Sequence, residues 1–388
     1  MTDVLCVLTH SPPASGWGGA MRSAAATARM MREAGFETRI VASNGNGAGS
    51  ALTQIEAEEA TGVACRLYHT PFAKRFGFGL GVLPALWGEA KQARCLYVSG
   101  VFTWPTTIGG WLARLMSKPY AVCTHGGLLL KHLDELRTLK PLRYAYYRLL
   151  VRPIIEGASL VRVSSTFEQR DLLAAFPKAR TVVIPNAFDV SAIPYHEERE
   201  ARRGRGFIYL GRLEQDKGIS RFLHLWLGIA GPEDRLRIIG SGTGEYADAL
   251  RALGATDQRV TLIGEVDRDG VYAELASSDI LCLPSGLDGT LRENFGNVVV
   301  EAFGVGRPVL VSRGLAWDHV EQSQVGILFE GDDLSIRDAI GRALNEAWVV
   351  SSETRRRCRQ HAQENFDSKA VGASVAAMVR SVSKGRSS

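Results

Sequence analysis

Residues 291–311 read Leu-Arg-Glu-Asn-Phe-Gly-Asn-Val-Val-Val-Glu-Ala-Phe-Gly-Val-Gly-Arg-Pro-Val-Leu-Val, and this order predicts a loop, a helix and a buried strand in succession. Glu293 lies in a polar segment that contains glycine and predicts a loop. The apolar run at 298–303, which includes Glu301, predicts the first turns of a helix. Gly-Arg-Pro at 306–308 ends that helix, and 309–311 predict the next strand.

A helix that starts in this stretch would offer an anion-binding end. The backbone N–H groups of Phe295, Gly296 and Asn297 are expected at its N-terminus, where free N–H groups and the helix dipole bind phosphate. In a continuous helix, the eight positions from Glu293 to Glu301 would span about 12 Å. That is the scale of a nucleotide sugar, so the two carboxylates could serve opposite parts of one ligand.

The composition is that of an ordinary globular protein. The chain has 388 residues, 45% apolar and 22% charged, with a net charge of +5, and it lacks the basic block typical of nucleic-acid binders. Its six cysteines form no Cys-x-x-Cys pair, and three of them lie in apolar runs that predict strands. We therefore expect reduced cysteines and a cytosolic protein. The first ten residues lack the pattern of a signal peptide.

The first half of the chain alternates between predicted strands and helices. Short apolar runs at 4–8, 40–42, 96–99, 119–124 and 160–165 predict buried parallel strands, and a helix is expected at about 20–34. The Gly-rich loop at 11–19 resembles the start of a dinucleotide-binding unit, but Met21 stands where that fingerprint has its third glycine. A turn that merely requires glycine explains this loop equally well.

Two features of this half have more than one interpretation. His125, followed by two glycines, comes directly after a predicted strand, where ligand sites of open parallel sheets lie. It is either a ligand-contacting residue or a structural hydrogen-bonding residue. Residues 139–155 are aromatic and basic, so they would form either a segment on an anionic membrane surface or an ordinary packing helix.

The second half repeats the alternation after a charged linker at 195–205. A strand at 207–211 precedes Arg212 and Lys217, two cations that can stabilise a diphosphate leaving group. Further strands are expected at 236–240, 260–264, 280–285 and 325–329, and 334–382 should be helical. The two runs predict an α/β protein with two doubly wound Rossmann-like domains that face each other across a cleft. We assign 1–190 and 200–365 to these domains and expect a last helix, 366–384, to pack back on the first.

These segments together resemble the family 4 retaining glycosyltransferases, which have the GT-B fold. The resemblance is carried by Glu-x7-Glu followed by Ala-Phe-Gly-x-Gly-x-Pro-Val, by Gly-Arg-Leu-x-x-x-Lys-Gly at 211–218 and by Val-Ile-Pro-Asn-Ala-x-Asp at 183–189. The stretch around Glu293 is similar to a bacterial polysaccharide branch. The sequence departs from the family pattern at Asn294 and Ala187, where glycine is usual, and at 303–304, where a small pair is usual.

The resemblance implies a role for each motif. Glu301 would bind the ribose hydroxyls, Glu293 the donor sugar, and Arg212 with Lys217 the diphosphate. The implied catalytic set is Arg212, Lys217, His125 and Glu293. The implied donor-binding set is Gly18, Gly19, Gly242, Val266, Phe295, Gly296, Asn297 and Glu301, with the base near the backbone of Val266.

The implied activity is retaining transfer of a hexose from a nucleoside diphosphate sugar to a glycan or lipid-linked acceptor, in cell-surface polysaccharide synthesis. The family needs no metal or other cofactor, and no Asp-x-Asp motif stands out here. We expect a cytoplasmic protein with no nucleic-acid partner, either free or in peripheral contact with the inner membrane face. A nucleotide-sugar 2-epimerase and a non-catalytic nucleotide-sugar-binding protein remain alternatives. An NAD-dependent dehydrogenase is disfavoured by the missing glycine. The donor sugar, base, acceptor, linkage and oligomeric state stay open.

Overall fold

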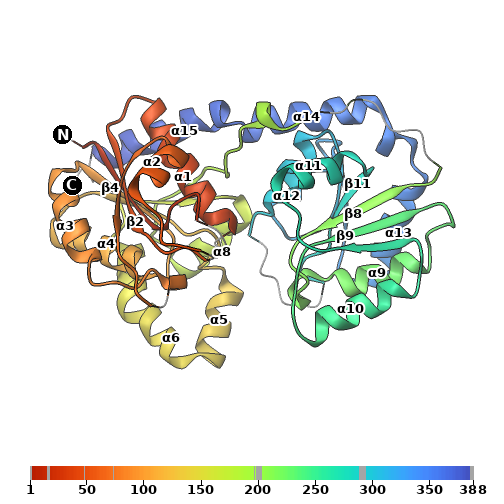
Figure 1. Cartoon of the computed structure of the whole chain (residues 1–388), viewed down its shortest axis with the longest axis horizontal. Coiled ribbons are helices and arrows are strands. Elements are labelled where there is room, and N and C mark those ends of the chain that lie inside the picture. The colour runs from red at the N-terminus through yellow and green to blue at the C-terminus, as the bar shows by residue number, and fades with distance from the viewer. Residues whose placement is uncertain are drawn as a thin grey trace. The chain divides into compact units, whose positions relative to one another are not determined.

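The computed structural model describes residues 2–14, 18–47, 49–72, 74–195, 197, 203–287 and 294–384. The chain divides into two compact domains (Figure 1). The first holds the residues up to Ala187 and those from Ser368 onward, and the second holds Phe188–Asp367. The second domain is therefore inserted between the body of the first domain and its last helix.

The first domain is built on a parallel sheet of seven strands in the order β3-β2-β1-β4-β5-β6-β7. Residues alternate between its faces, as in β1, where Leu5 and Val7 enter one core and Val4 and Cys6 enter the other. Both faces are buried, which explains why the strands read as continuous apolar runs. The strands are β1 (Val4–His10), β2 (Thr38–Ser43), β3 (Ala64–Tyr68), β4 (Cys95–Ser99), β5 (Tyr120–Cys123), β6 (Leu160–Val163) and β7 (Thr181–Val183).

Helices cover both faces of this sheet. One core takes side chains from α1 (Gly18–Glu33), α2 (Gln54–Thr61) and α15 (Ser368–Ser383). The other takes them from α3 (Val82–Gln92), α4 (Trp104–Leu115), α5 (Leu130–Leu139), α7 (Arg152–Gly157) and α8 (Thr166–Ala175). Helix α15 packs on α1, and its Ser383 Oγ lies 3.5 Å from Cys95 Sγ. The last helix of the chain thus belongs to the first domain.

Most of residues 139–155 form one helix, as one interpretation of their sequence predicted, and its buried side chains Tyr147, Val151 and Ile154 pack in the core of the first domain. Helix α5 ends at Leu139, and α6 (Pro141–Tyr146), a π-helical turn η2 (Tyr147–Val151) and α7 follow. Pro141 stands in the first turn of α6, where the missing N–H costs nothing, and Pro153 comes just after the π-helical turn. The backbone is therefore helical without a break from Pro141 to Gly157, and only the π-helical turn changes its hydrogen bonding.

The second domain has a parallel sheet of six strands in the order β10-β9-β8-β11-β12-β13. The strands are β8 (Gly206–Leu210), β9 (Arg235–Ile239), β10 (Val260–Ile263), β11 (Ile280–Leu283), β12 (Val309–Ser312) and β13 (Gly326–Phe329). One core includes residues of α9 (Ile219–Leu227), α10 (Glu245–Ala255) and α13 (Asp333–Asn345). The other includes residues of α11 (Arg268–Ala276), α12 (Asn297–Gly304) and α14 (Ser352–Phe366).

Short helical turns complete the description: η1 (Lys74–Phe76), η3 (Val190–Ala192), η4 (Gln215–Lys217) and η5 (Ala347–Val350). The six cysteines are all free and buried, as expected from their apolar surroundings. Within the described part of the chain, no helix is both long enough and apolar enough to cross a membrane.

The order of strands places the functional loops. It reverses between β1 and β4 in the first domain and between β8 and β11 in the second. Ligands of open parallel sheets bind beyond the carboxyl ends of strands at such a switch point. The loop after β1 leads to α1, the loop after β8 carries Arg212 and Lys217, and the loop after β11 leads to α12.

Candidate functional site

Helix α12 presents its N-terminus at the switch point of the second sheet. It starts at Asn297, and Gly296 precedes it in the left-handed conformation, with φ 67°. Phe295 is buried, and its carbonyl accepts a hydrogen bond of 2.5 Å from Trp317 Nε1. The expectation that Phe295, Gly296 and Asn297 lie at a helix N-terminus is confirmed, and the first N–H groups of such a helix form an anion site.

Glu301 lies one turn further along α12 and is partly exposed. It attracts Arg268 at the start of α11, whose Nε donates to the hydroxyl of Tyr272 at 2.8 Å. Burial lowers the pKa of Arg268, but Tyr272 and Glu301 outweigh burial, so the pKa is raised. The carboxylate therefore lies close to α11. Glu293, the other carboxylate of the motif, lies outside the described residues.

A buried arginine holds α11 and α12 in place. Arg307 follows α12, and its guanidinium donates to the carbonyls of Ser278 at 2.8 Å and Ala276 at 2.5 Å, at the end of α11. Its side chain is 1% exposed. Because a buried guanidinium must keep its hydrogen bonds, this contact limits movement between the ends of the two helices.

The loop after β8 carries the two predicted diphosphate ligands. Lys217 is buried in the turn η4 and is followed by Gly218, with φ 66°. A Cβ atom on Gly218 would lie 2.1 Å from the carbonyl oxygen of Pro284, just after β11. The backbone amide of Gly286 also donates to the Asp216 carbonyl at 3.1 Å. The lysine is thus held against the loop that leads to α12.

Arg212 has a different environment from Lys217. Its side chain is 62% exposed, and Nη1 forms an ion pair of 2.5 Å with Glu214. Its backbone carbonyl accepts a hydrogen bond of 2.8 Å from the Tyr209 hydroxyl, which fixes the start of the loop. An exposed ion pair contributes little to stability, so the guanidinium can exchange Glu214 for an anionic ligand at small cost.

The loops after β8 and β9 meet through glycines. A Cβ atom on Gly242 would lie 2.5 Å from the Leu213 carbonyl oxygen, and one on Gly240 would lie 1.9 Å from that of Gly211. The Leu213 amide donates to the Ser241 carbonyl at 2.8 Å. Gly242 is therefore required for this close approach, whether or not it also contacts a ligand.

Val266 lies between β10 and α11, within the same cluster of loops. It packs against the core next to α12, and Asp267 caps α11 by accepting from the Gly270 amide at 2.8 Å. The Ser241 hydroxyl donates to Glu265, which joins the loop after β9 to the loop after β10. The predicted base-contacting residue thus lies in a segment that hydrogen bonds hold on both sides.

In the first domain, α1 begins at Gly18, and Gly19 is its second residue. The helix is anchored by Ser23, whose hydroxyl donates to Asn186 Oδ1 at 2.6 Å, and by Thr27, which accepts from Arg162 Nη1 at 2.7 Å. The two predicted glycines are therefore at the N-terminus of a fixed helix, the position at which a helix attracts phosphate.

His125 lies two residues after the end of β5 and adopts a left-handed conformation, with φ 46°. Its Nε2 lies 2.8 Å from Ser99 Oγ at the end of β4. Burial disfavours the charged imidazole, but the negative charge of the neighbouring Cys123 thiolate favours it, so the pKa of His125 is raised. The residue is thus a hydrogen-bonded part of the fold, at the edge of the sheet where ligands bind.

Glu168, which the sequence analysis did not single out, holds the loop around His125. Its carboxylate is 2% exposed and accepts from Thr124 Oγ1 at 2.5 Å, the Gly126 amide at 2.6 Å, and the Ser164 amide and hydroxyl at 2.8 Å each. The sequence signal was Ser-x-x-Glu at 165–168, a capping-box spacing, and Ser165 does cap α8. The spacing indicates a helix start but not the partner loop.

The fold is that of the GT-B class, with two Rossmann-like domains, and a helix N-terminus lies beyond the strand ends of each sheet. Residues 204–346 match the family described as "Glycosyl transferases group 1", and residues 18–187 match the "Glycosyl transferase 4-like domain". The chain belongs to glycosyltransferase family 4, as its motifs indicated.

Curated relatives agree with this assignment over part of their length. A phosphatidyl-myo-inositol mannosyltransferase of Mycobacterium leprae is 30% identical over 164 residues, which is 41% of this chain and 43% of that protein. The enzyme of the same description from Propionibacterium freudenreichii is 29% identical over 252 residues, covering 62% and 60%. The chain therefore aligns with about half the length of these relatives.

Solved structures agree in fold over nearly the whole chain. Sucrose-phosphate synthase from Thermosynechococcus elongatus has a TM-score of 0.72 at 17% identity, covering 98% of both chains. HepE from Anabaena, determined with UDP and glucose, has a TM-score of 0.69 at 18% identity, covering 98% of this chain and 100% of that one. At these identities the likeness shows the fold alone.

Proposed function

We propose that this protein is a retaining hexosyltransferase that uses a nucleoside diphosphate sugar and a glycan or lipid-linked acceptor. The observation that carries the proposal is the loop cluster of the second domain. The N-terminus of α12 and the turn that holds Lys217 follow the two strands at the switch point, and Pro284 contacts the glycine after that lysine. A helix end and a cation at one sheet edge suit a diphosphate.

Each residue has a chemical role in this proposal. Glu301 accepts hydrogen bonds from the ribose hydroxyls, and Val266 contacts the base through its backbone. Lys217 and Arg212 neutralise the diphosphate, Arg212 after releasing Glu214. Glu293 binds hydroxyls of the donor sugar, and His125 contacts that sugar, as the family resemblance implies. Gly18, Gly19 and Gly242 allow the backbone to come close to the phosphates.

The reaction transfers one glycosyl group. The bond between the anomeric carbon and the β-phosphate oxygen breaks, and the nucleoside diphosphate leaves with the electron pair. The acceptor oxygen bonds to the same face of that carbon through an oxocarbenium-like state, and its proton passes to the departing phosphate oxygen. Positive charge at Lys217, Arg212 and the α12 N-terminus stabilises the leaving group, so we propose that the step needs no metal or other cofactor.

The acceptor and the location belong to the same proposal. Two relatives are named for transfer of mannose to phosphatidyl-myo-inositol, a lipid, and WaaG, of similar fold with a TM-score of 0.63, is described as involved in lipopolysaccharide biosynthesis. These descriptions support a lipid-linked or glycan acceptor in cell-surface polysaccharide synthesis. We accordingly propose a cytoplasmic enzyme that works at the inner membrane face and has no nucleic-acid partner.

The test is a transfer assay with sugar-labelled UDP-hexoses and GDP-hexoses, with and without a bacterial lipid and glycan extract. We expect label in the extract, with the anomeric configuration of the donor retained as judged by NMR coupling constants. Lys217→Ala is the matched inactive control. A new nucleotide sugar formed without extract would indicate an epimerase. Donor binding without transfer or hydrolysis would indicate a binding protein, and an inverted product would refute the retaining step.

A further inference from the structure

The first domain has one segment in which scattered positive charges outnumber negative ones. Residues 90–155 contain ten Lys and Arg against two Asp and Glu. The whole chain has 46 against 41, so the remainder has 36 against 39 and is slightly acidic. This segment includes α4, α6, η2 and the end of α3, which all lie in or beside the helical layer on one face of the first sheet.

The same layer exposes large apolar side chains. Leu115 is 75% exposed, Leu149 is 70% exposed and Leu83 is 50% exposed. Trp87 of α3 and Trp111 of α4 are also exposed. We call this surface the basic apolar face; it consists of Leu83, Trp87, Lys91, Trp111, Arg114, Leu115, Lys118, Arg148, Leu149 and Leu150.

Hydrogen bonds join the elements of this face into one surface. Trp111 Nε1 donates to the Leu150 carbonyl at 3.1 Å, and Arg114 Nη1 donates to that of Pro153 at 2.7 Å, which ties α4 to η2 and α7. On its other side, Lys118 Nζ donates to the Ala93 carbonyl at 2.5 Å, just beyond α3. The exposed side chains of the three segments are therefore neighbours and not scattered singly.

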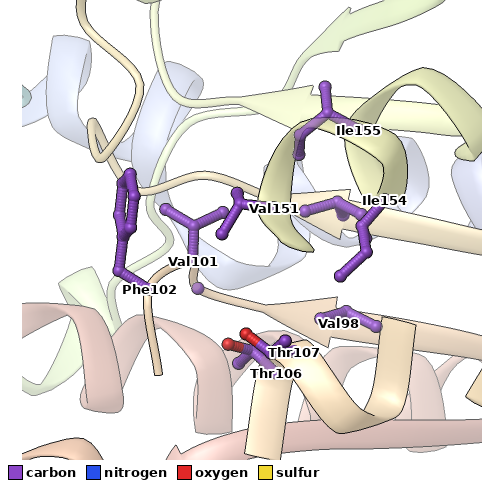
Figure 2. Close-up of a pocket in the computed structure, with 10 residues that line it drawn as sticks. Val98, Val101, Phe102, Thr106, Thr107, Val151, Ile154 and Ile155 are labelled. Atoms are coloured by element: carbon purple, nitrogen blue, oxygen red, sulfur yellow. The ribbon is translucent and has the colours of Figure 1, made fainter. Parts of the chain in front are cut away.

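The exposure of these side chains does not come from loose packing. A Cβ atom on Gly110 would lie 2.6 Å from the Ile154 side chain, so that side chain packs directly against the backbone of α4. Figure 2 shows Val151 and Ile154 on the inner side of this layer, above Val98 of β4, where they line a small apolar hollow. The inner side chains of this layer fill the core, and the outer side chains, which form the basic apolar face, remain exposed to solvent.

Tryptophan and cations are paired on this face. Lys91 Nζ lies 5.2 Å from the centre of the Trp87 ring, and the Arg114 guanidinium lies 5.4 Å from that of Trp111. Glu89, the acidic residue of α3, does not neutralise these cations, because it is buried and pairs with Arg39 and Arg66. Aromatic rings beside cations, between exposed leucines, are typical of proteins at the interface of an anionic bilayer.

We propose that the basic apolar face docks the protein on the surface of a bilayer containing anionic lipids. The leucines and tryptophans enter the boundary of the acyl region, and the four cations meet the lipid phosphates. A nucleic acid would use the cations but not the leucines, and a purely apolar partner would not use the cations. This docking rests on the proposed function in one respect, because a lipid-linked acceptor would be reached at the membrane surface.

The test is sedimentation of the full chain with vesicles of phosphatidylcholine alone and of phosphatidylcholine with phosphatidylglycerol. We expect binding to the anionic vesicles that weakens with salt, since each cation near the surface contributes about fivefold to affinity. The double variant Leu115→Gln/Leu149→Gln and the charge variant Lys91→Glu/Arg148→Glu should each lower it by about tenfold or more.

The matched control is Ile55→Gln/Leu334→Gln, which removes two exposed apolar side chains from α2 and α13. It should bind vesicles like the wild type. Equal binding by the Leu115/Leu149 variant would overturn the proposal, and so would a wild type that ignores anionic vesicles. A dimer that this variant dissociates, without lipid binding, would assign the face to a second copy of the chain instead.

Donor hydrolysis in the absence of lipid separates this proposal from the proposed function. The face variants should hydrolyse a nucleotide sugar at the wild-type rate, because their side chains are outside the loops that we assign to the donor. Vesicle binding by a protein that never turns over any donor would refute the proposed activity and leave the docking face supported.

Discussion

Replacing Glu168 by glutamine should loosen the loop that holds His125. The carboxylate accepts from two backbone amides, Gly126 and Ser164, and from two hydroxyls, Thr124 and Ser164. Glutamine has the same shape, but its nitrogen can only donate. A hydroxyl can turn to accept from that nitrogen, whereas a backbone N–H cannot. Either orientation of the amide therefore leaves one N–H without an acceptor.

The magnitude follows from these contacts. An orphaned buried donor costs about 1–3 kcal/mol, and the remaining hydrogen bonds lose the benefit of the charged acceptor. We expect Glu168→Gln to destabilise the first domain by about 2–4 kcal/mol. For a domain of about 200 residues, each kcal/mol lowers the Tm by about 2–4 °C, so the shift should be about 4–16 °C.

Calorimetry of the full chain measures this shift, because the two domains need not unfold in one transition. The transition of the first domain should move and that of the second should not. The exposed Glu33→Gln in the same domain is the control for removing a carboxylate. A Glu168→Gln protein whose first-domain Tm falls no further than that of the control would refute the reasoning.

Three other changes test the second domain. Lys217→Ala should fold normally and lower kcat by about 10²–10³, since charge on the leaving group grows in the transition state; wild-type turnover would remove Lys217 from the mechanism. Glu301→Gln should weaken both the donor and the free nucleoside diphosphate by about 1.5–3 kcal/mol in calorimetric titration, whereas Glu293→Gln should impair transfer and spare the nucleotide; equal losses would contradict their separate roles. Burial and the neighbouring His319 lower the pKa of His361 to about 4, from 6.5. The unfolded chain therefore takes up this proton more readily, and stability is complete above about pH 6.5 and is lost as the pH falls toward 4. Urea midpoints at pH 7 and pH 5 should show this dependence, and His361→Gln should flatten it; an unchanged slope would refute the assignment.

Much of the local structure is determined by the sequence itself. Apolar runs of strand length between polar loops predict the parallel strands, because both faces of such a sheet are buried. The helix that starts at Asn297 follows from Phe-Gly-Asn before an apolar run, and Gly-Arg-Pro ends it. The motifs around Lys217 and Glu301 were also sufficient to indicate the family, because glycines, cations and carboxylates stand at fixed distances along the chain.

Only the tertiary structure decides which of these residues meet. Glu168 holds the loop of His125 through the amide of Gly126, 42 positions earlier in the chain, and Arg307 joins α12 to the end of α11. The basic apolar face forms only because α4 packs beside α3 and η2. Its leucines and cations are separated by buried residues in the sequence, so no single stretch shows the face. The spacing of residues along the sequence shows which side of a helix or strand is apolar and where a turn begins. Contacts between elements depend on the order of strands in the sheet, which no single stretch of sequence contains.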